Sequence, residues 1–172
     1  MIKATMKEKD GFGENGANQP SETQVLRDLI MGFRATQIIA TAAKLDLAEH
    51  LGHGPQTPVE LAHATNTNER RLYRLLRALT HLGILELNRD ARFSLSPMGN
   101  LLHERVPGSL RHVAILYGEE WLWGAYAQLA HSMKSDKPAF EYVYGQKLFD
   151  YLKENAAAAD RSFGRNDGAA PR

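Results

Sequence analysis

The side chains best suited to binding a metal or moving a proton are seven histidines. They form no H-E-x-x-H pattern, which would place two ligands on one face of a helix. His50 and His53 lie close together at the end of an expected helix, but the sequence offers no third ligand beside them. Because a catalytic zinc takes about three protein ligands, and because cysteine is absent, we expect no metal site.

Nucleophilic, acid–base and phosphate-binding motifs are also lacking. There is no G-x-S-x-G and no Walker loop. Glu119 and Glu120 are adjacent, so on a helix their carboxylates diverge rather than form an acid–base pair. The G-x-G-x-x-G at residues 11–16 has no strand before it and no helix directly after it, the context that dinucleotide binding requires. We therefore predict no catalytic and no cofactor-binding residue.

A basic helix face is the one feature that points to nucleic acid. Arg70, Arg74, Arg77 and His81 recur at i, i+4, i+7 and i+11. The whole chain is nearly neutral, with Lys+Arg 21 against Asp+Glu 20, so its overall field does not attract DNA. A solvated face is the favoured interpretation, and a DNA-binding winged-helix regulator remains the alternative.

This basic face belongs to a helix-turn-helix pattern. A short helix (Val59–Ala64) is capped by Thr57 and leads through a polar turn into a longer helix (Glu69–Leu82), which Gly83 ends. Two short strands follow, Ile84–Asn88 and Arg92–Ser96. The predicted fold is mainly α: a winged helix-turn-helix core with a two-stranded wing, flanked by long dimerising helices.

Before this core, residues 1–20 are polar and glycine-rich, and we predict a mobile arm. Ser21 is the expected N-cap of a long apolar helix whose apolar content extends to Leu51, before the Gly52–Pro55 break. Between Arg34 and Lys44 this segment carries no charge. A helix that is apolar on several sides must be covered on several sides, which a second chain would do.

After the core, the sequence predicts a helix from Ser109 to about Gly118 and an aromatic-rich helix from Glu119 to Met133. A last amphipathic helix, Gln146 to about Ala159, should turn Leu148, Phe149, Tyr151 and Leu152 inward. Residues 164–172 are aperiodic, so a domain over 21–163 with a disordered tail is predicted. No apolar run is long enough for a membrane span and no secretory signal opens the chain, so a cytoplasmic protein is expected.

The order of these segments resembles the N-terminal half of S-adenosylmethionine-dependent O-methyltransferases that act on small aromatic metabolites, over about residues 24–163. The most specific pieces are AAKLDLAEHL (42–51), RLLRALTHLGIL (74–85), LSPMG (95–99) and PAFEYVYG (138–145). The resemblance implies a homodimer through interlocking N-terminal helices. By matching positions it implies acceptor-binding side chains and interface side chains. These are Trp123, Tyr126 and Trp121 for the acceptor, and Leu29, Phe33, Gln37 and Ile38 for the interface.

The sequence departs from that family after the last helix, where an acidic Gly-rich loop for the methyl donor would be expected and no such motif occurs. The resemblance therefore predicts the dimerisation and acceptor-pocket half of a methyltransferase, without a donor site or catalytic base and inactive on its own. A stand-alone protein that binds an aromatic metabolite, or that regulates a methyltransferase by mixed dimerisation, is a further alternative.

Overall fold

The computed structural model describes residues 20–163. Apart from Pro20, the predicted arm lies outside these residues, as do the G-x-G-x-x-G at 11–16 and the predicted tail at 164–172. The chain forms two units, residues 1–32 and 33–172, whose boundary falls within the first helix. Within residues 20–163, no helix combines the length and apolar character that crossing a membrane requires.

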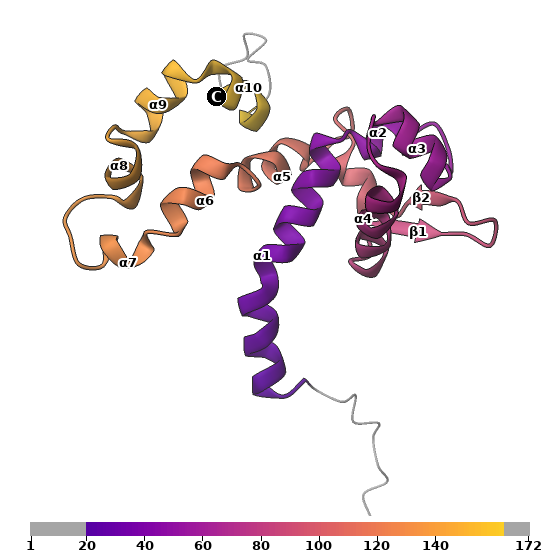
Figure 1. The fold of residues 1–172 in the computed structure, drawn as a ribbon, viewed down its shortest axis with the longest axis horizontal. Helices are drawn as coiled ribbons and strands as arrows, with labels where there is room; N and C mark the ends of the chain where they lie inside the picture. Colours follow the sequence, from indigo (N-terminus) through magenta and orange to yellow (C-terminus); the bar gives the residue numbers. More distant parts are fainter. Residues whose placement is uncertain (1–19, 164–172) are drawn as a thin grey trace, which may run out of the picture. The chain divides into compact units, whose positions relative to one another are not determined.

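The described residues are mainly helical, and their only sheet is a two-stranded antiparallel hairpin (Figure 1). The elements follow one another in the order α1 (Glu22–Lys44), α2 (Leu47–Leu51), α3 (Pro58–Ala64), α4 (Glu69–His81), β1 (Leu85–Leu87), β2 (Phe93–Leu95), the 3-10 turn η1 (Gly99–Leu102), α5 (Arg111–Tyr117), α6 (Glu120–Tyr126), α7 (Leu129–Ser132), α8 (Ala139–Tyr144), α9 (Leu148–Glu154) and α10 (Ala156–Phe163).

In the first unit, α1 begins at the predicted cap. The Ser21 hydroxyl accepts a hydrogen bond from the backbone N–H of Gln24 at 3.2 Å. Every described residue of this unit, 20–32, is exposed, including three apolar side chains that we call the α1 stripe. The α1 stripe consists of Leu26, Leu29 and Ile30, exposed by 59%, 73% and 64%.

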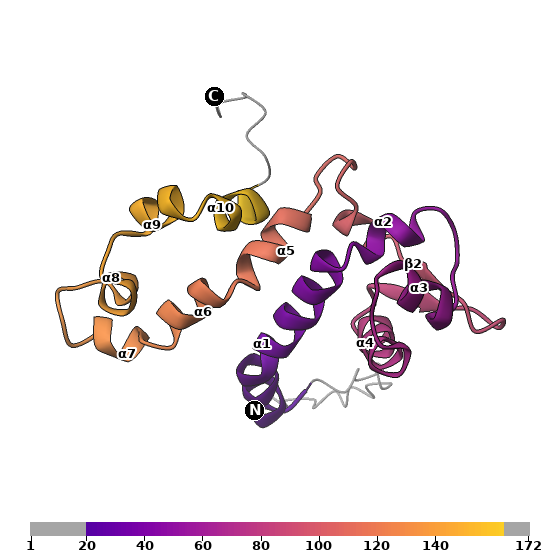
Figure 2. The same ribbon diagram turned by 45° about the horizontal axis from the view of Figure 1, so that its top comes forward.

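The helix-turn-helix of the second unit is built as its cap residues predict. Thr57 and Glu60 form a capping box: the Glu60 N–H donates to the Thr57 hydroxyl at 3.3 Å, and the Thr57 N–H donates to the Glu60 carboxylate at 2.7 Å. Asn68 caps α4 by accepting from the Arg71 N–H at 3.1 Å. After α4, Gly83 takes a φ of 73°, which an L side chain rarely adopts. Figures 1 and 2 show α3 and α4 side by side, with the hairpin against α4.

The wing is shorter than predicted, with three residues in each strand. Leu85 pairs with Leu95 and Leu87 with Phe93, and Phe93 also bridges to Gln56 ahead of α3. Phe93 is fully buried in the main core, to which α1, α2, α3, α4, the hairpin and η1 all contribute. The winged-helix prediction is confirmed.

Three helices expected to be continuous are interrupted. The first breaks at Leu45–Asp46, where Asp46 takes a left-handed φ of 53° and its carboxylate pairs with Arg111. This bend starts α2, which buries Leu47 and Leu51. The aromatic-rich helix breaks between α6 and α7, and the last helix breaks at Asn155 between α9 and α10.

A second, smaller core lies in the C-terminal half, built from buried Trp121, Leu152 and Ala158. α6 packs on α8, α8 on α9, and α10 on both α9 and α5. One prediction here was wrong: Phe149 is 75% exposed rather than inward-facing. Leu148, Tyr151 and Leu152 recur at i, i+3 and i+4 and share the face that packs in the smaller core, whereas Phe149 lies about 100° around the helix from Leu148.

Candidate functional site

An aromatic cavity of about 830 Å³ opens between α6, α8, α9 and α10. Its lining is dominated by rings, with two carboxylates and one amide. The lining residues are Glu119, Glu120, Trp121, Trp123, Gly124, Ala127, Tyr144, Tyr151, Asn155 and Ala158. Its volume falls in the range of about 300–1,000 Å³ that small-molecule sites occupy.

The rings of this cavity are held by one another. Trp121 lies edge-on to Phe140, with centroids 6.2 Å apart, and tilted against Tyr151 at 6.1 Å. The ring centroids of Tyr144 and Tyr151 lie 5.2 Å apart. Such offset and edge-to-face arrangements are the favoured ones for aromatic pairs. Contacts between the rings therefore position the side chains of this wall.

Gly124 leaves room for Tyr144 at the cavity wall. A Cβ atom at Gly124 would collide with the Tyr144 hydroxyl, so a side chain there would displace that ring. Burial raises the pKa of Tyr144 above its ordinary value of 10, and the neighbouring Tyr151 and Glu120 raise the pKa further. The hydroxyl of Tyr144 is thus a neutral group at physiological pH, able to donate and to accept.

Trp123 lines both the aromatic cavity and a second, smaller one. Its indole N–H donates to the backbone carbonyl of Tyr117 at 2.6 Å, and its ring meets Phe33 edge-on at 6.3 Å. The smaller cavity, of about 310 Å³, is lined by Phe33, Thr36, Tyr117, Leu122, Trp123 and Tyr126. Of the predicted acceptor residues, Trp121 and Trp123 line the aromatic cavity, and Trp123 and Tyr126 line the smaller one.

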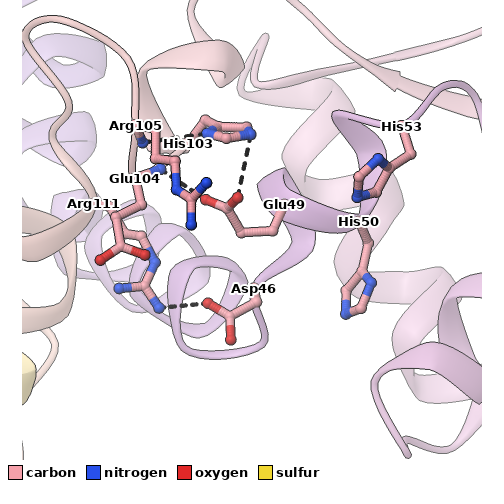
Figure 3. A pocket seen from close by; sticks show the side chains of 8 residues that line it. All are labelled: Asp46, Glu49, His50, His53, His103, Glu104, Arg105 and Arg111. Atoms are coloured by element: carbon pink, nitrogen blue, oxygen red, sulfur yellow. Dashed lines mark hydrogen bonds and ion pairs between the residues drawn. The ribbon is translucent and has the colours of Figure 1, made fainter.

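A third, charged cavity of about 540 Å³ lies at the end of α2 (Figure 3). It is lined by Asp46, Glu49, His50, His53, His103, Glu104, Arg105 and Arg111. Glu49 accepts from the Glu104 N–H at 2.7 Å, and its other oxygen lies 3.2 Å from His103 Nε2. Asp46 pairs with Arg111. These two carboxylates thus join α2 and its N-cap to the segment after η1 and to the first residue of α5.

His50 and His53 do not complete a metal site in this cavity. Figure 3 shows both imidazoles across the cavity from Arg105 and Arg111. Among the residues that the structure describes, no three His, Cys, Asp or Glu side chains are grouped so that they could hold a metal ion. The charged cavity is therefore best explained as a set of structural ion pairs.

The basic face of α4 is exposed. Arg70, Arg74, Arg77 and His81 all lie at the surface, and within residues 20–163 none of them forms an ion pair. Their exposure agrees with the predicted solvated face.

The predicted interface residues differ in how far they are exposed. Leu29 and Phe33 are exposed, and Gln37 is half-buried. Ile38 packs against the main core of its own chain.

Sequence reasoning did not identify Gly124, Tyr144 and Tyr151 as members of the aromatic cavity. The aromatic-rich PAFEYVYG segment was the available signal for Tyr144.

Comparison with known proteins gives a consistent family. A family model described as the O-methyltransferase dimerisation domain matches residues 27–105. A phenazine O-methyltransferase of Lysobacter antibioticus is 32% identical over 149 residues, which cover 87% of this chain and 43% of that enzyme. The match to this relative thus continues well beyond the wing.

Solved structures of similar fold are also methyltransferases. The N,N-8-amino-8-demethyl-D-riboflavin dimethyltransferase of Streptomyces davawensis superimposes with a TM-score of 0.78 at 30% identity, over 83% of this chain and 43% of that one. A methyltransferase of calicheamicin biosynthesis, solved in its SAH-bound form, superimposes with a TM-score of 0.70 at 28% identity, over 85% and 44%.

The chain thus spans less than half the length of each of these relatives. Both the sequence match and the fold cover the winged helix and the helices after it. Residues 27–105 are therefore an O-methyltransferase dimerisation domain, and the chain as a whole is similar to part of the small-molecule methyltransferases described above.

Proposed function

We propose that the chain forms a homodimer and supplies part of the acceptor site of an S-adenosylmethionine-dependent O-methyltransferase that acts on a small, planar aromatic metabolite. The observation that carries this proposal is the α1 stripe, which leaves Leu26, Leu29 and Ile30 exposed. Burying a side chain of this size stabilises an assembly by about 1.5–3 kcal/mol, so a row of them along one helix favours association.

A second copy of the same chain is the occupant that the family supports. The dimerisation-domain match covers residues 27–105, which include Leu29, Ile30, Phe33 and Gln37. Of the predicted interface residues, Leu29 and Phe33 present the largest exposed apolar surfaces. We assign these two to the centre of the interface and Gln37 to its edge, whereas Ile38 is shared with the core of its own chain.

For the acceptor, the aromatic cavity is the proposed site. Flat rings such as those of Trp121 and Trp123 bury a planar molecule by stacking and apolar contact. Tyr126 lines the smaller cavity, which shares Trp123 with the aromatic cavity, and we assign it a contact with a substituent of the acceptor.

The described residues do not fit the methyl donor. Dinucleotide and mononucleotide sites of this kind use a Gly-rich loop between a parallel strand and a helix, whereas residues 20–163 contain only an antiparallel hairpin. The calicheamicin relative is solved in an SAH-bound form, so the proposed donor of the whole protein is S-adenosylmethionine. The role assigned to residues 20–163 is to dimerise and to bind and orient the acceptor, in the cytoplasm.

The test is a comparison of molar masses by light scattering at micromolar concentration. We expect the wild-type chain to have twice its mass of 19.2 kDa. The variant Leu29→Glu places a charge in the α1 stripe and should be a monomer, since burying an unpaired carboxylate opposes association. Val59→Glu, at a site on α3 that is 59% exposed, is the matched control and should remain a dimer.

A monomeric wild-type chain would overturn the proposal. No second function is proposed, because the relatives described above are methyltransferases and the exposed arginines of α4 are explained as a solvated face.

A further inference from the structure

The charged side chains among the described lining of the aromatic cavity are all of one sign. Two carboxylates, Glu119 and Glu120, belong to its lining, and no Lys, Arg or His stands among the described residues that line it. The remaining described lining is neutral, made of rings, small residues and the amide of Asn155.

The two carboxylates differ in how far their charge reaches the cavity. Glu119 is buried, and its Oε1 lies 3.0 Å from the Lys44 ammonium, which offsets its charge. Glu120, one residue later, is exposed and forms no ion pair with any residue in the described part of the chain. Its negative charge also acts on the Tyr144 hydroxyl across the cavity wall.

The rings of the lining favour the same sign of charge where a ligand meets their faces. The faces of Trp and Tyr rings carry negative potential, and four such rings line the cavity: Trp121, Trp123, Tyr144 and Tyr151. A cation over the face of such a ring is attracted by this potential, and more strongly when a carboxylate is close by. An anion in the same place would lose its hydration without gaining a cationic partner.

We propose that the aromatic cavity selects a neutral or positively charged planar aromatic acceptor, such as one bearing an amine, and rejects one that carries a carboxylate. Glu120 is the specificity-determining residue, and the rings supply the stacking surface. This inference rests on the proposed acceptor site, and it adds the charge of the molecule that the site accepts.

The test uses three naphthalene probes that differ only in the charge of one substituent: 2-naphthylmethylammonium, 2-naphthol and 2-naphthoate. Calorimetry with the full 172-residue chain at pH 7 and low salt gives the three dissociation constants. We expect the ammonium probe to bind at least about tenfold more tightly than naphthoate, with naphthol between them.

Glu120→Gln removes the charge and keeps the shape of the side chain. It should reduce the ratio of the naphthoate dissociation constant to the ammonium dissociation constant at least about threefold, mainly because the ammonium probe binds less tightly. The dissociation constant of naphthol should stay nearly unchanged. Asp136→Asn is the matched control, because it makes the same change of net charge at an exposed site outside the cavity lining and should leave the ratio unchanged.

The outcomes separate the two proposals. If naphthoate binds as tightly as the ammonium probe, or if Glu120→Gln leaves the ratio unchanged, the charge preference is overturned and the acceptor site stands. If none of the three probes binds, the acceptor site itself is overturned, and the charge preference falls with it. Glu120 is exposed, so the folded state should tolerate the substitution, which circular dichroism checks.

Discussion

Arg92 of the wing donates two hydrogen bonds to the carboxylate of Glu60, at 2.9 and 3.3 Å, while the same carboxylate caps the start of α3. A single side chain therefore closes the capping box with Thr57 and holds the wing to the helix-turn-helix. This contact joins residues 32 positions apart and contributes to the placement of the hairpin.

The Glu60 contact should make stability depend on pH. The hydrogen bonds from Thr57, and then Arg92, hold the pKa of Glu60 below its ordinary value of 4.5. A group with a lowered pKa in the folded state stabilises the fold above its unfolded pKa, and this contribution is lost as the pH falls through the folded pKa. Glu60→Gln should therefore lower the urea midpoint at pH 7 and differ progressively less from wild type as the pH falls below about 4.5.

Urea denaturation from pH 7 to pH 3 measures this difference. Glu86→Gln, at an exposed position of β1, is the control and should show no such convergence. A gap between Glu60→Gln and wild type that stays constant over the whole range would contradict the assigned role.

An ion pair between a buried carboxylate and a partly exposed lysine at the start of α6 gives a second prediction. The Lys44 ammonium lies 3.0 Å from Glu119 Oε1 and donates to the carbonyl of Gly118 at 3.1 Å. Lys44→Met removes the cation from a buried carboxylate and should destabilise the fold by about 1–3 kcal/mol. This loss is smaller than for a fully buried ion pair, because the Lys44 side chain is 39% exposed.

The control for the Lys44 prediction is an exposed pair of a lysine ammonium and a carboxylate. Lys153 lies 3.0 Å from Asp150, and the two side chains are 76% and 54% exposed. Lys153→Met should therefore cost less than about 1 kcal/mol in the same chemical denaturation experiment. Equal losses for the two variants would show that Lys44 does not stabilise the α6 start.

Close backbone approach at Gly118 gives a third prediction. A Cβ at this position would collide with the Cβ of Ala40, so Gly118→Ala should destabilise the fold by about 1–3 kcal/mol through overpacking. Gly32→Ala is the matched control, since nothing in the single chain lies within 4 Å of a Cβ there. At a helical position with this space, alanine should stabilise the single chain by about 0.5–1 kcal/mol relative to glycine. If thermal unfolding shows Gly118→Ala to be more stable than Gly32→Ala, the close approach of Gly118 to Ala40 is excluded.

Much of the winged helix could be predicted from the sequence because its signals are local. Thr57, Asn68 and Gly83 act through the backbone within a few residues of themselves, so their effect does not depend on the rest of the fold. The buried leucines of α4 recur at helical spacing for the same reason.

The helix breaks could not be predicted because their causes are distant. Asp46 bends the chain where its partner, Arg111, lies 65 residues later. Asn155 ends α9 where α10 turns to pack on α5, a contact that no local pattern encodes. Helix propensity alone favoured continuous helices at both places.

For the aromatic cavity, the resemblance pointed to two rings of α6 but not to Gly124 on the same helix or to the tyrosines of α8 and α9. Trp121 and Trp123 were identified from a resemblance, and both line the cavity. Tyr144 and Tyr151 reach it only because α8 and α9 fold back toward α6, and Gly124 matters only because the Tyr144 hydroxyl comes to lie over it. Periodicity places a side chain on a helix face but does not say which other helix covers that face.

The central claim, that a second copy covers the α1 stripe, is tested most directly by cysteine labelling. The chain contains no cysteine, so Leu29→Cys and Val59→Cys each report on one position. Both side chains are exposed in the single chain, by 73% and 59%, so a reduced reaction of Leu29→Cys requires another molecule. With a water-soluble maleimide at micromolar protein, we predict labelling of Leu29→Cys at least about tenfold slower than that of Val59→Cys, and convergence of the two rates on dilution. Equal rates at every protein concentration would contradict the claim.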